Sequence, residues 1–133
     1  MTYKWPTAMW LMLLWFVCSA YPQKQQALPN LTYAELIQNN HAYLGKTVRL
    51  KAVWRYGFEW TYLCTSECKD VEESWVKVLD EDDLCRGSKS KLKKMGKRDD
   101  NAAEVVVVGR LEEGSRYHFQ FVISCVEEFK KLH

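Results

Sequence analysis

The sequence predicts a mainly β domain in which five strands close into a small barrel. Residues 46–64 (KTVRLKAVWRYGFEWTYLC) alternate apolar and polar side chains on both sides of a reversal near Tyr56 and Gly57, which is the pattern of a half-buried hairpin. Residues 103–112 (AEVVVVGRLE) are rich in β-branched side chains, as expected for a buried strand. Closing such strands into a barrel removes the edges that they would otherwise expose.

The first 20 residues have the features of a secretory signal peptide. Lys4 supplies a positive charge before the apolar run AMWLMLLWFV, and Cys18-Ser19-Ala20 offers small residues to a signal peptidase. The apolar run is too short to span a bilayer, which takes about 20 residues, so we expect no stable transmembrane segment in the mature chain. The predicted product is secreted or periplasmic and begins near Tyr21.

A polar leader and a short helix precede the strands. Residues 21–30 (YPQKQQALPN) contain two prolines and should form no folded element, while residues 31–133 are too few for more than a single domain. A helix should begin after Thr32, whose hydroxyl can cap it, and Glu35 completes a capping box. The helix should end by Gly45.

The hairpin is followed by a short third strand at residues 75–79 (WVKVL). A charged excursion and two more strands come after it. The excursion, residues 80–100, should be partly helical, with one helical turn around residues 88–95. Gly109 marks a bulge in the fourth strand, and residues 117–126 (YHFQFVISCV) form the fifth, followed by a polar tail. The first strand is long enough to pair in both of the sheets that make up an OB-like barrel, so a five-stranded OB-like barrel is the best fit.

The charge balance does not favour a nucleic-acid-binding protein. The formal net charge is only +2, whereas such proteins usually carry a marked positive excess. Seven basic residues lie between Arg86 and Arg98, but acidic residues on both sides nearly cancel them. We therefore interpret this segment as a solvated loop.

Several short motifs occur in a recognisable order along the mature chain. They are Gly45-Lys46-x-Val48-x-Leu50, Gly57-Phe58-Glu59, Cys64-x-x-x-Cys68, the strand beginning at Trp75, the run VVVGR ending at Arg110, and Tyr117-x-Phe119-x-Phe121. This order resembles small exported bacterial proteins of unknown function with an OB-like barrel. The resemblance implies a fold and a compartment but no activity. Those proteins often carry Gly-His before the last strand, where this chain has Gly114-Ser115-Arg116, so no role for that histidine carries over.

Four cysteines beyond the signal allow three disulfide pairings. In an OB-like barrel the fifth strand runs parallel to the third, which brings Cys125 near Cys85 and leaves Cys64 at the opposite end. We therefore favour Cys85–Cys125 and Cys64–Cys68, the second of which needs a turn because extended residues would exceed the ~7 Å limit between Cα atoms. The spacing of Cys64 and Cys68 fits neither a zinc site nor a redox Cys-x-x-Cys, so we predict no metal and no cofactor.

Exposed aromatic side chains are the best candidates for binding. Barrels of this type bind ligands across strands two and three, and aromatic rings there can stack on sugars or bases. The predicted ligand-binding residues are Arg55, Tyr56, Trp60, Tyr62, Trp75 and Arg116, with Phe58 on the same face. The alternative is that Trp54, Phe58, Trp60 and Trp75 fill the barrel interior.

No catalytic motif is visible. The chain lacks a Gly-x-Ser-x-Gly elbow and a phosphate loop, and none of its three histidines has a nucleophile nearby in sequence. We therefore predict a binding module and not an enzyme, with a protein or glycan partner in the cell envelope. Two alternatives remain: single-stranded nucleic-acid binding through the aromatics and the basic excursion, or a structural envelope protein without a discrete ligand. The oligomeric state is not predicted.

Overall fold

The computed structural model describes residues 27–66, 68, 74–96, 101–114 and 118–132. The predicted signal peptide (1–20), most of the leader (21–30) and Arg116 lie outside these residues. The elements in chain order are β1 (Asn30–Thr32), α1 (Tyr33–Gln38), α2 (Asn40–Tyr43), β2 (Thr47–Tyr56), β3 (Thr61–Cys64), β4 (Ser74–Val78), the 3-10 turn η1 (Glu81–Asp83), α3 (Ser88–Leu92), the 3-10 turn η2 (Lys93–Met95), β5 (Asn101–Glu113) and β6 (Phe119–Leu132).

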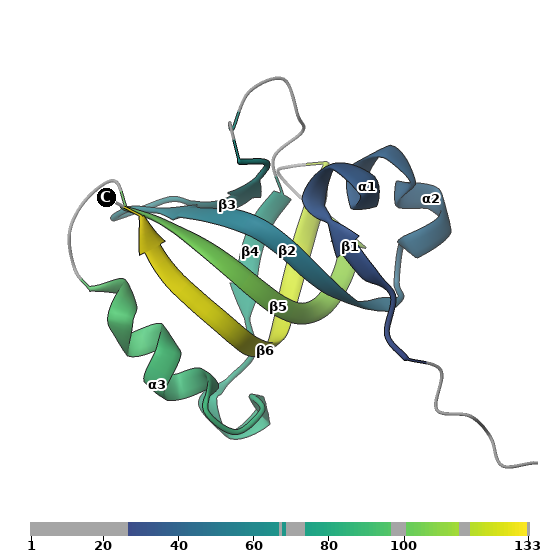
Figure 1. Cartoon of the computed structure of the whole chain (residues 1–133). Coiled ribbons are helices and arrows are strands. Elements are labelled where there is room, and N and C mark those ends of the chain that lie inside the picture. The colour runs from purple at the N-terminus through teal and green to yellow at the C-terminus, as the bar shows by residue number, and fades with distance from the viewer. Residues whose placement is uncertain (1–26, 67, 69–73, 97–100, 115–117, 133) are drawn as a thin grey trace, which may run out of the picture.

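Five of the six strands form a closed ring, in the order β2–β3–β4–β6–β5 and back to β2 (Figure 1). β4 and β6 run parallel, and all other neighbours in the ring are antiparallel. β2 pairs with β5 along its whole length, from Thr47 opposite Arg110 to Tyr56 opposite Asn101. The mainly β class, the five predicted strands and the parallel third and fifth strands are thus confirmed.

The core lies inside the ring and follows the alternation of β2. Val48, Leu50, Ala52 and Trp54 are all buried and face inward. Trp54 satisfies its polar group by donating from Nε1 to Thr61 Oγ1 at 2.6 Å. Each large apolar side chain that is fully buried here contributes about 1.5–3 kcal/mol relative to exposure. The inside of the ring is filled by buried residues of β4, β5 and β6, which are Val76, Ala103, Val105, Val107, Leu111, Phe121, Ile123 and Val126.

Helix α1 covers one end of the ring and begins as predicted. The Glu35 amide donates to Thr32 Oγ1 at 3.3 Å, and the Thr32 amide donates to the Glu35 carboxylate at 3.0 Å, which completes the capping box. Tyr33 and Leu36 point into the core, and the Tyr33 hydroxyl hydrogen-bonds the buried Ser74 hydroxyl at 2.9 Å.

The excursion between β4 and β5 packs along the outside of β6. It contains α3 and η2 over the predicted segment 88–95. The buried Ser88 hydroxyl accepts a hydrogen bond from the Val126 amide at 2.8 Å, and a disulfide joins Cys85 to Cys125. The other disulfide joins Cys64 to Cys68. Both favoured pairings are therefore present in the structure.

Several boundaries differ from the sequence prediction. β1 was not predicted; it pairs in parallel with the first half of β2, with Leu31 opposite Leu50. β6 continues through the predicted polar tail to Leu132, because the backbone of that tail pairs with β5 although four of its last six side chains are charged. The predicted irregularity at Gly109 is present as a register shift, and an added Cβ there would collide with the Val122 carbonyl and the Phe121 ring. Among the described residues, no helix is long and apolar enough to cross a membrane.

Candidate functional site

Three side chains form a row across the outer surface of β2, β3 and β4. Arg55 lies opposite Tyr62, and Tyr62 lies opposite Trp75. Because Trp54 and Val76 point into the core, their neighbours Arg55 and Trp75 must point outward. Trp60, which precedes β3, lies beside this row. We call Arg55, Trp60, Tyr62 and Trp75 the aromatic face, and all four are half-buried.

Contacts between neighbouring rings hold the aromatic face together. The Trp60 and Tyr62 ring centroids are 5.4 Å apart with an interplanar angle of 32°, and the Arg55 guanidinium carbon lies 6.0 Å from the Trp60 ring centroid. The second distance is within the range of a cation–π interaction. Gly57 allows this arrangement, because a Cβ at that position would collide with the Trp60 indole. The face is therefore formed before any ligand arrives.

Tyr56 does not belong to this surface, contrary to the sequence prediction. It is only 5% exposed and points into the ring, where its side chain packs edge-to-face against Trp54 at 6.1 Å. Its hydroxyl donates to the Met95 carbonyl at 3.0 Å, and burial raises the pKa of Tyr56. Successive residues of a strand face opposite sides, so Arg55 and Tyr56 cannot share one face.

The alternative that the aromatics fill the interior holds for Trp54 and fails for Phe58. Trp54 is buried, Trp60 and Trp75 are half-buried, and Phe58 at the tip of the β2–β3 hairpin is 86% exposed. Phe58 sits in the turn and not in the paired part of β3, so the alternation of the strand does not govern its direction. Of the predicted binding residues, Arg116 lies outside the described residues.

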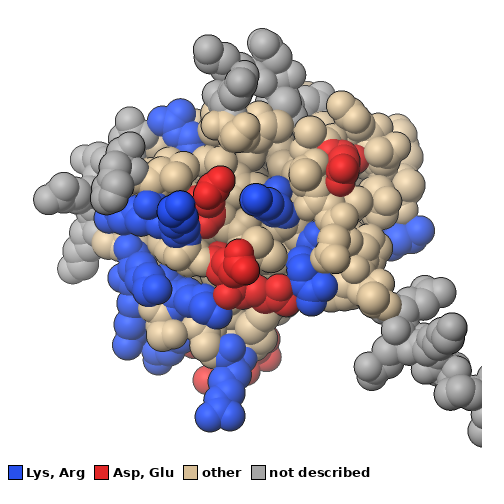
Figure 2. Space-filling view, in the orientation of Figure 1, with Lys and Arg blue, Asp and Glu red and all other residues tan. Residues whose placement is uncertain are grey.

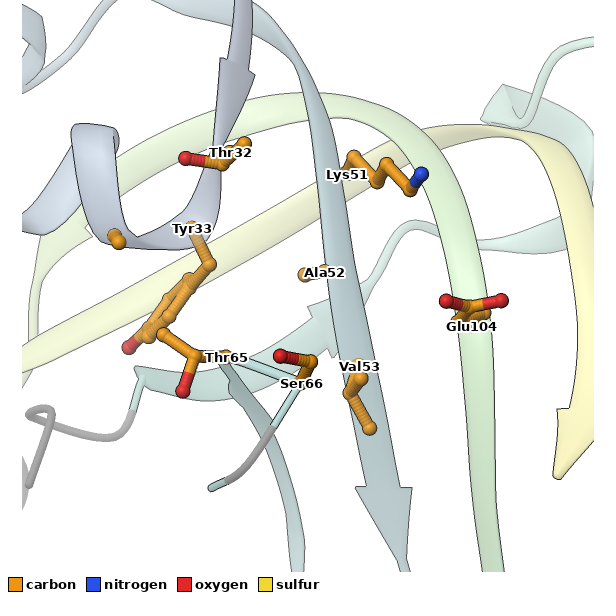
Figure 3. Close-up of a pocket in the computed structure, with 9 residues that line it drawn as sticks. Thr32, Tyr33, Lys51, Ala52, Val53, Thr65, Ser66 and Glu104 are labelled. Carbon is orange, nitrogen blue, oxygen red and sulfur yellow. The ribbon is translucent and has the colours of Figure 1, made fainter. Parts of the chain in front are cut away.

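A separate groove of about 360 Å³ opens beside β2, at the point where the strand paired with β2 changes from β1 to β3 (Figure 3). β1 pairs with β2 as far as Lys51, and β3 begins its pairing at Val53. The start of α1 and the residues after β3 flank the gap between these two strands. In the close-up, Tyr33 and Thr65 lie on one side of β2, and Glu104 lies on the other side, on β5.

The groove is lined by both apolar and polar residues. The polar and charged ones are Lys51, Glu104, Thr32, Thr65 and Ser66. Such groups can hydrogen-bond a small polar ligand, but nothing in their arrangement selects one chemistry. This groove was not predicted from the sequence, because it requires β1, whose only signal was a single apolar residue, Leu31, between polar neighbours.

Charges of both signs are mixed on the outer surface of β2, β5 and β6, whereas Lys and Arg gather over α3 (Figure 2). Arg49 on β2 and Glu127 on β6 form a two-pronged salt bridge with N–O distances of 2.8 and 3.0 Å. The hydrogen bond to Glu127 raises the pKa of Arg49 above its ordinary value. On α3, Lys89 pairs with Glu81 at 2.8 Å, and this hydrogen bond lowers the pKa of Glu81.

The described residues contain no group of three His, Cys, Asp or Glu side chains that could hold a metal ion. His118 is exposed just before β6. No protein-family model matches this chain, and no curated protein matches it either.

Proposed function

We propose that the chain is an exported binding module built on an OB-like barrel, and that its aromatic face binds a glycan or a protein in the cell envelope. In chain order the ring strands occupy positions one, two, three, five and four, with the third and fifth parallel, which supports an OB-like barrel. The signal-like N-terminus and the two disulfides support export to an oxidising compartment.

The aromatic face is the observation that carries this proposal. Tyr62 and Trp75 are cross-strand neighbours on β3 and β4, where OB-like barrels commonly bind their ligands. Half-buried rings have little conformational freedom left to lose, and Trp, Tyr and Arg are the residues that most often dominate protein interfaces. The same flat apolar surfaces can stack on sugar rings. Arg55 is the one cation among the four residues of the face, which suits a neutral or weakly anionic ligand better than a polyanion.

The test compares Trp75→Ala and Tyr62→Ala with Tyr43→Ala, a control at another half-buried aromatic on α2. Each variant is applied to an array of envelope oligosaccharides and, immobilised, to an envelope extract. For each ligand that the unmodified chain retains, we expect W75A and Y62A to lower the binding affinity by at least about 10-fold, since loss of a buried aromatic anchor costs ~2 kcal/mol. Y43A should bind like the unmodified chain.

Two outcomes would contradict the proposal. Retention of the same ligands by all variants would show that the aromatic face is not the binding surface. Tight, salt-sensitive binding of a single-stranded oligonucleotide at physiological salt, lost in W75A, would assign the face to nucleic acid instead.

A further inference from the structure

Among the described residues, the two exposed large apolar side chains lie at the same end of the molecule. Phe58 is 86% exposed and Leu132 is 37% exposed. Phe58 is in the β2–β3 hairpin tip, two residues beyond Tyr56, and Tyr56 pairs with Asn101 at the start of β5. The next residue of β5, Ala102, pairs with Leu132. The hairpin tip and the end of β6 are therefore neighbours across β5, as Figure 1 shows at the end marked C.

Lysines of η2 and β6 lie at the same end of the molecule as these apolar side chains. The Tyr56 hydroxyl binds the Met95 carbonyl, so η2, with Lys93 and Lys94, ends beside the base of the hairpin. A Cβ on Gly96 would lie 3.6 Å from Lys131 Nζ, which brings the end of η2 against the end of β6. The exposed lysines gathered here are Lys93, Lys94, Lys130 and Lys131. We call these four lysines, with Phe58 and Leu132, the basic end.

The basic end keeps a positive excess after its acidic neighbours are counted. The acidic residues on the same segments are Glu59 in the hairpin tip, Glu104 opposite Lys130, and the exposed Glu128 two positions before Lys130. Four lysines and Arg55 near the tip, against these three carboxylates, leave an excess of two positive charges. Residues 97–100 (KRDD), which the structure does not describe, carry two charges of each sign and leave this sum unchanged.

We propose that the basic end docks reversibly onto an anionic membrane surface. An exposed aromatic at a hairpin tip can enter the boundary between headgroups and acyl chains, while neighbouring lysines attract anionic lipid headgroups. Neither contribution is sufficient alone, and the two together give the weak, salt-dependent attachment typical of peripheral proteins. This surface is distinct from Tyr62 and Trp75, so the inference does not depend on the function proposed for the aromatic face.

A membrane fits these side chains better than a nucleic acid. Base stacking would use Phe58 but gives no reason for an exposed aliphatic side chain beside it, because Leu132 has no ring to stack. The acyl region of a bilayer accepts both side chains. Phe58, which is 86% exposed at a hairpin tip, is free to enter the hydrocarbon boundary while the lysines stay among the headgroups.

Vesicle sedimentation of the chain purified from an exporting host tests the inference. The probes are vesicles of phosphatidylcholine alone and vesicles in which phosphatidylglycerol replaces a third of it. We expect binding to the anionic vesicles that weakens as salt rises. Lys93→Gln with Lys94→Gln should lower the partition coefficient on the order of 20-fold. Phe58→Ser should lower it by about 10-fold or more, and Phe58→Trp should preserve it.

Matched variants control for charge, folding and the N-terminal segment. Lys46→Gln with Lys77→Gln removes two exposed lysines outside the basic end and should leave vesicle binding unchanged. All variants share the same N-terminus, so any contribution from residues 1–20 cancels in the comparison. Urea unfolding of each variant shows whether it is folded, which the exposure of Phe58, Lys93 and Lys94 leads us to expect.

The inference would be overturned by three results. The first is equal binding to both kinds of vesicle. The second is an equal loss of vesicle binding in the Lys93/Lys94 and the Lys46/Lys77 double variants, which would show that only net charge matters. The third is an oligonucleotide that binds more tightly than anionic vesicles and is indifferent to Phe58→Ser. Failure of Trp75→Ala to alter vesicle binding is expected and keeps this test separate from that of the aromatic face.

Discussion

Tyr56 connects the base of the β2–β3 hairpin to the end of the excursion. Its ring packs against Trp54, and its hydroxyl holds the Met95 carbonyl at 3.0 Å. Burial disfavours the phenolate, which is why the pKa of Tyr56 is raised in the folded chain. The same residue therefore orients the basic end and responds to alkaline pH.

We predict that Tyr56→Phe makes the stability of the fold less sensitive to high pH. The folded pKa lies above the unfolded value of ~10, so the contribution of the protonated hydroxyl is complete below that value and is lost as the pH rises through the folded pKa. At neutral pH the variant should lose about 1 kcal/mol with its hydrogen bond.

Urea unfolding at neutral pH and in steps above pH ~10 measures both effects. The unmodified chain should lose stability more steeply than Y56F over the alkaline range. Equal slopes for the two proteins would contradict the assignment of a buried, hydrogen-bonded phenol to Tyr56.

At the scale of elements, α1 illustrates a structure set by local chemistry. The capping box lies within four consecutive residues, Thr32 to Glu35, and both of its hydrogen bonds are present. The position of the helix over the end of the ring depends in addition on Tyr33 and Leu36, which are buried in the core.

Removing the cap should destabilise the domain by a modest amount. Thr32→Ala leaves the Glu35 amide without its acceptor and should cost about 1 kcal/mol of unfolding free energy. Thr32→Ser keeps a hydroxyl at the cap and should lower the unfolding free energy by only about a few tenths of a kcal/mol. Urea midpoints at constant slope give both values, and an equal loss in the two variants would show that the cap does not contribute.

Elements whose formation depends on a distant partner were harder to predict. The last six residues of β6 carry four charged side chains, and only their backbone pairing with β5 makes them a strand. β1 likewise is a strand because Leu31 lies beside Leu50, which is far along the chain. Hydrophobic periodicity reports burial and not backbone pairing, so it missed both.

At the scale of the whole molecule, the two disulfides restrain the chain to different degrees. Cys85 and Cys125 are separated by 40 positions and fasten the excursion to β6, whereas Cys64 and Cys68 are separated by only 4. A cross-link stabilises the fold chiefly by restricting the unfolded chain, and the restriction grows with the length of the loop that it closes.

Replacing Cys85 and Cys125 together by Ser should therefore destabilise the fold by about 4 kcal/mol, against about 2 kcal/mol for Cys64 and Cys68. Urea unfolding of the oxidised proteins measures the difference between the two double variants. A larger loss from the Cys64–Cys68 pair would contradict the dominance of loop length and indicate a specific role for the turn after β3.

The sequence alone determined the mainly β class, the inward side of β2, the capping box and, given the expected strand order, both disulfide pairings. It also selected Arg55, Tyr62 and Trp75, which the register of β2, β3 and β4 places on one face, and Trp60, whose ring lies against Tyr62. These features follow from period-two alternation and from contacts between near neighbours in the chain.

Only the tertiary structure decided which separate segments meet. It opened a groove between the end of β1 and the start of β3, and it brought Phe58, Lys93 and Leu132 to one end. The physical reason is that ring closure fixes long-range register, and register sets the neighbours of a side chain across strands that share no local pattern.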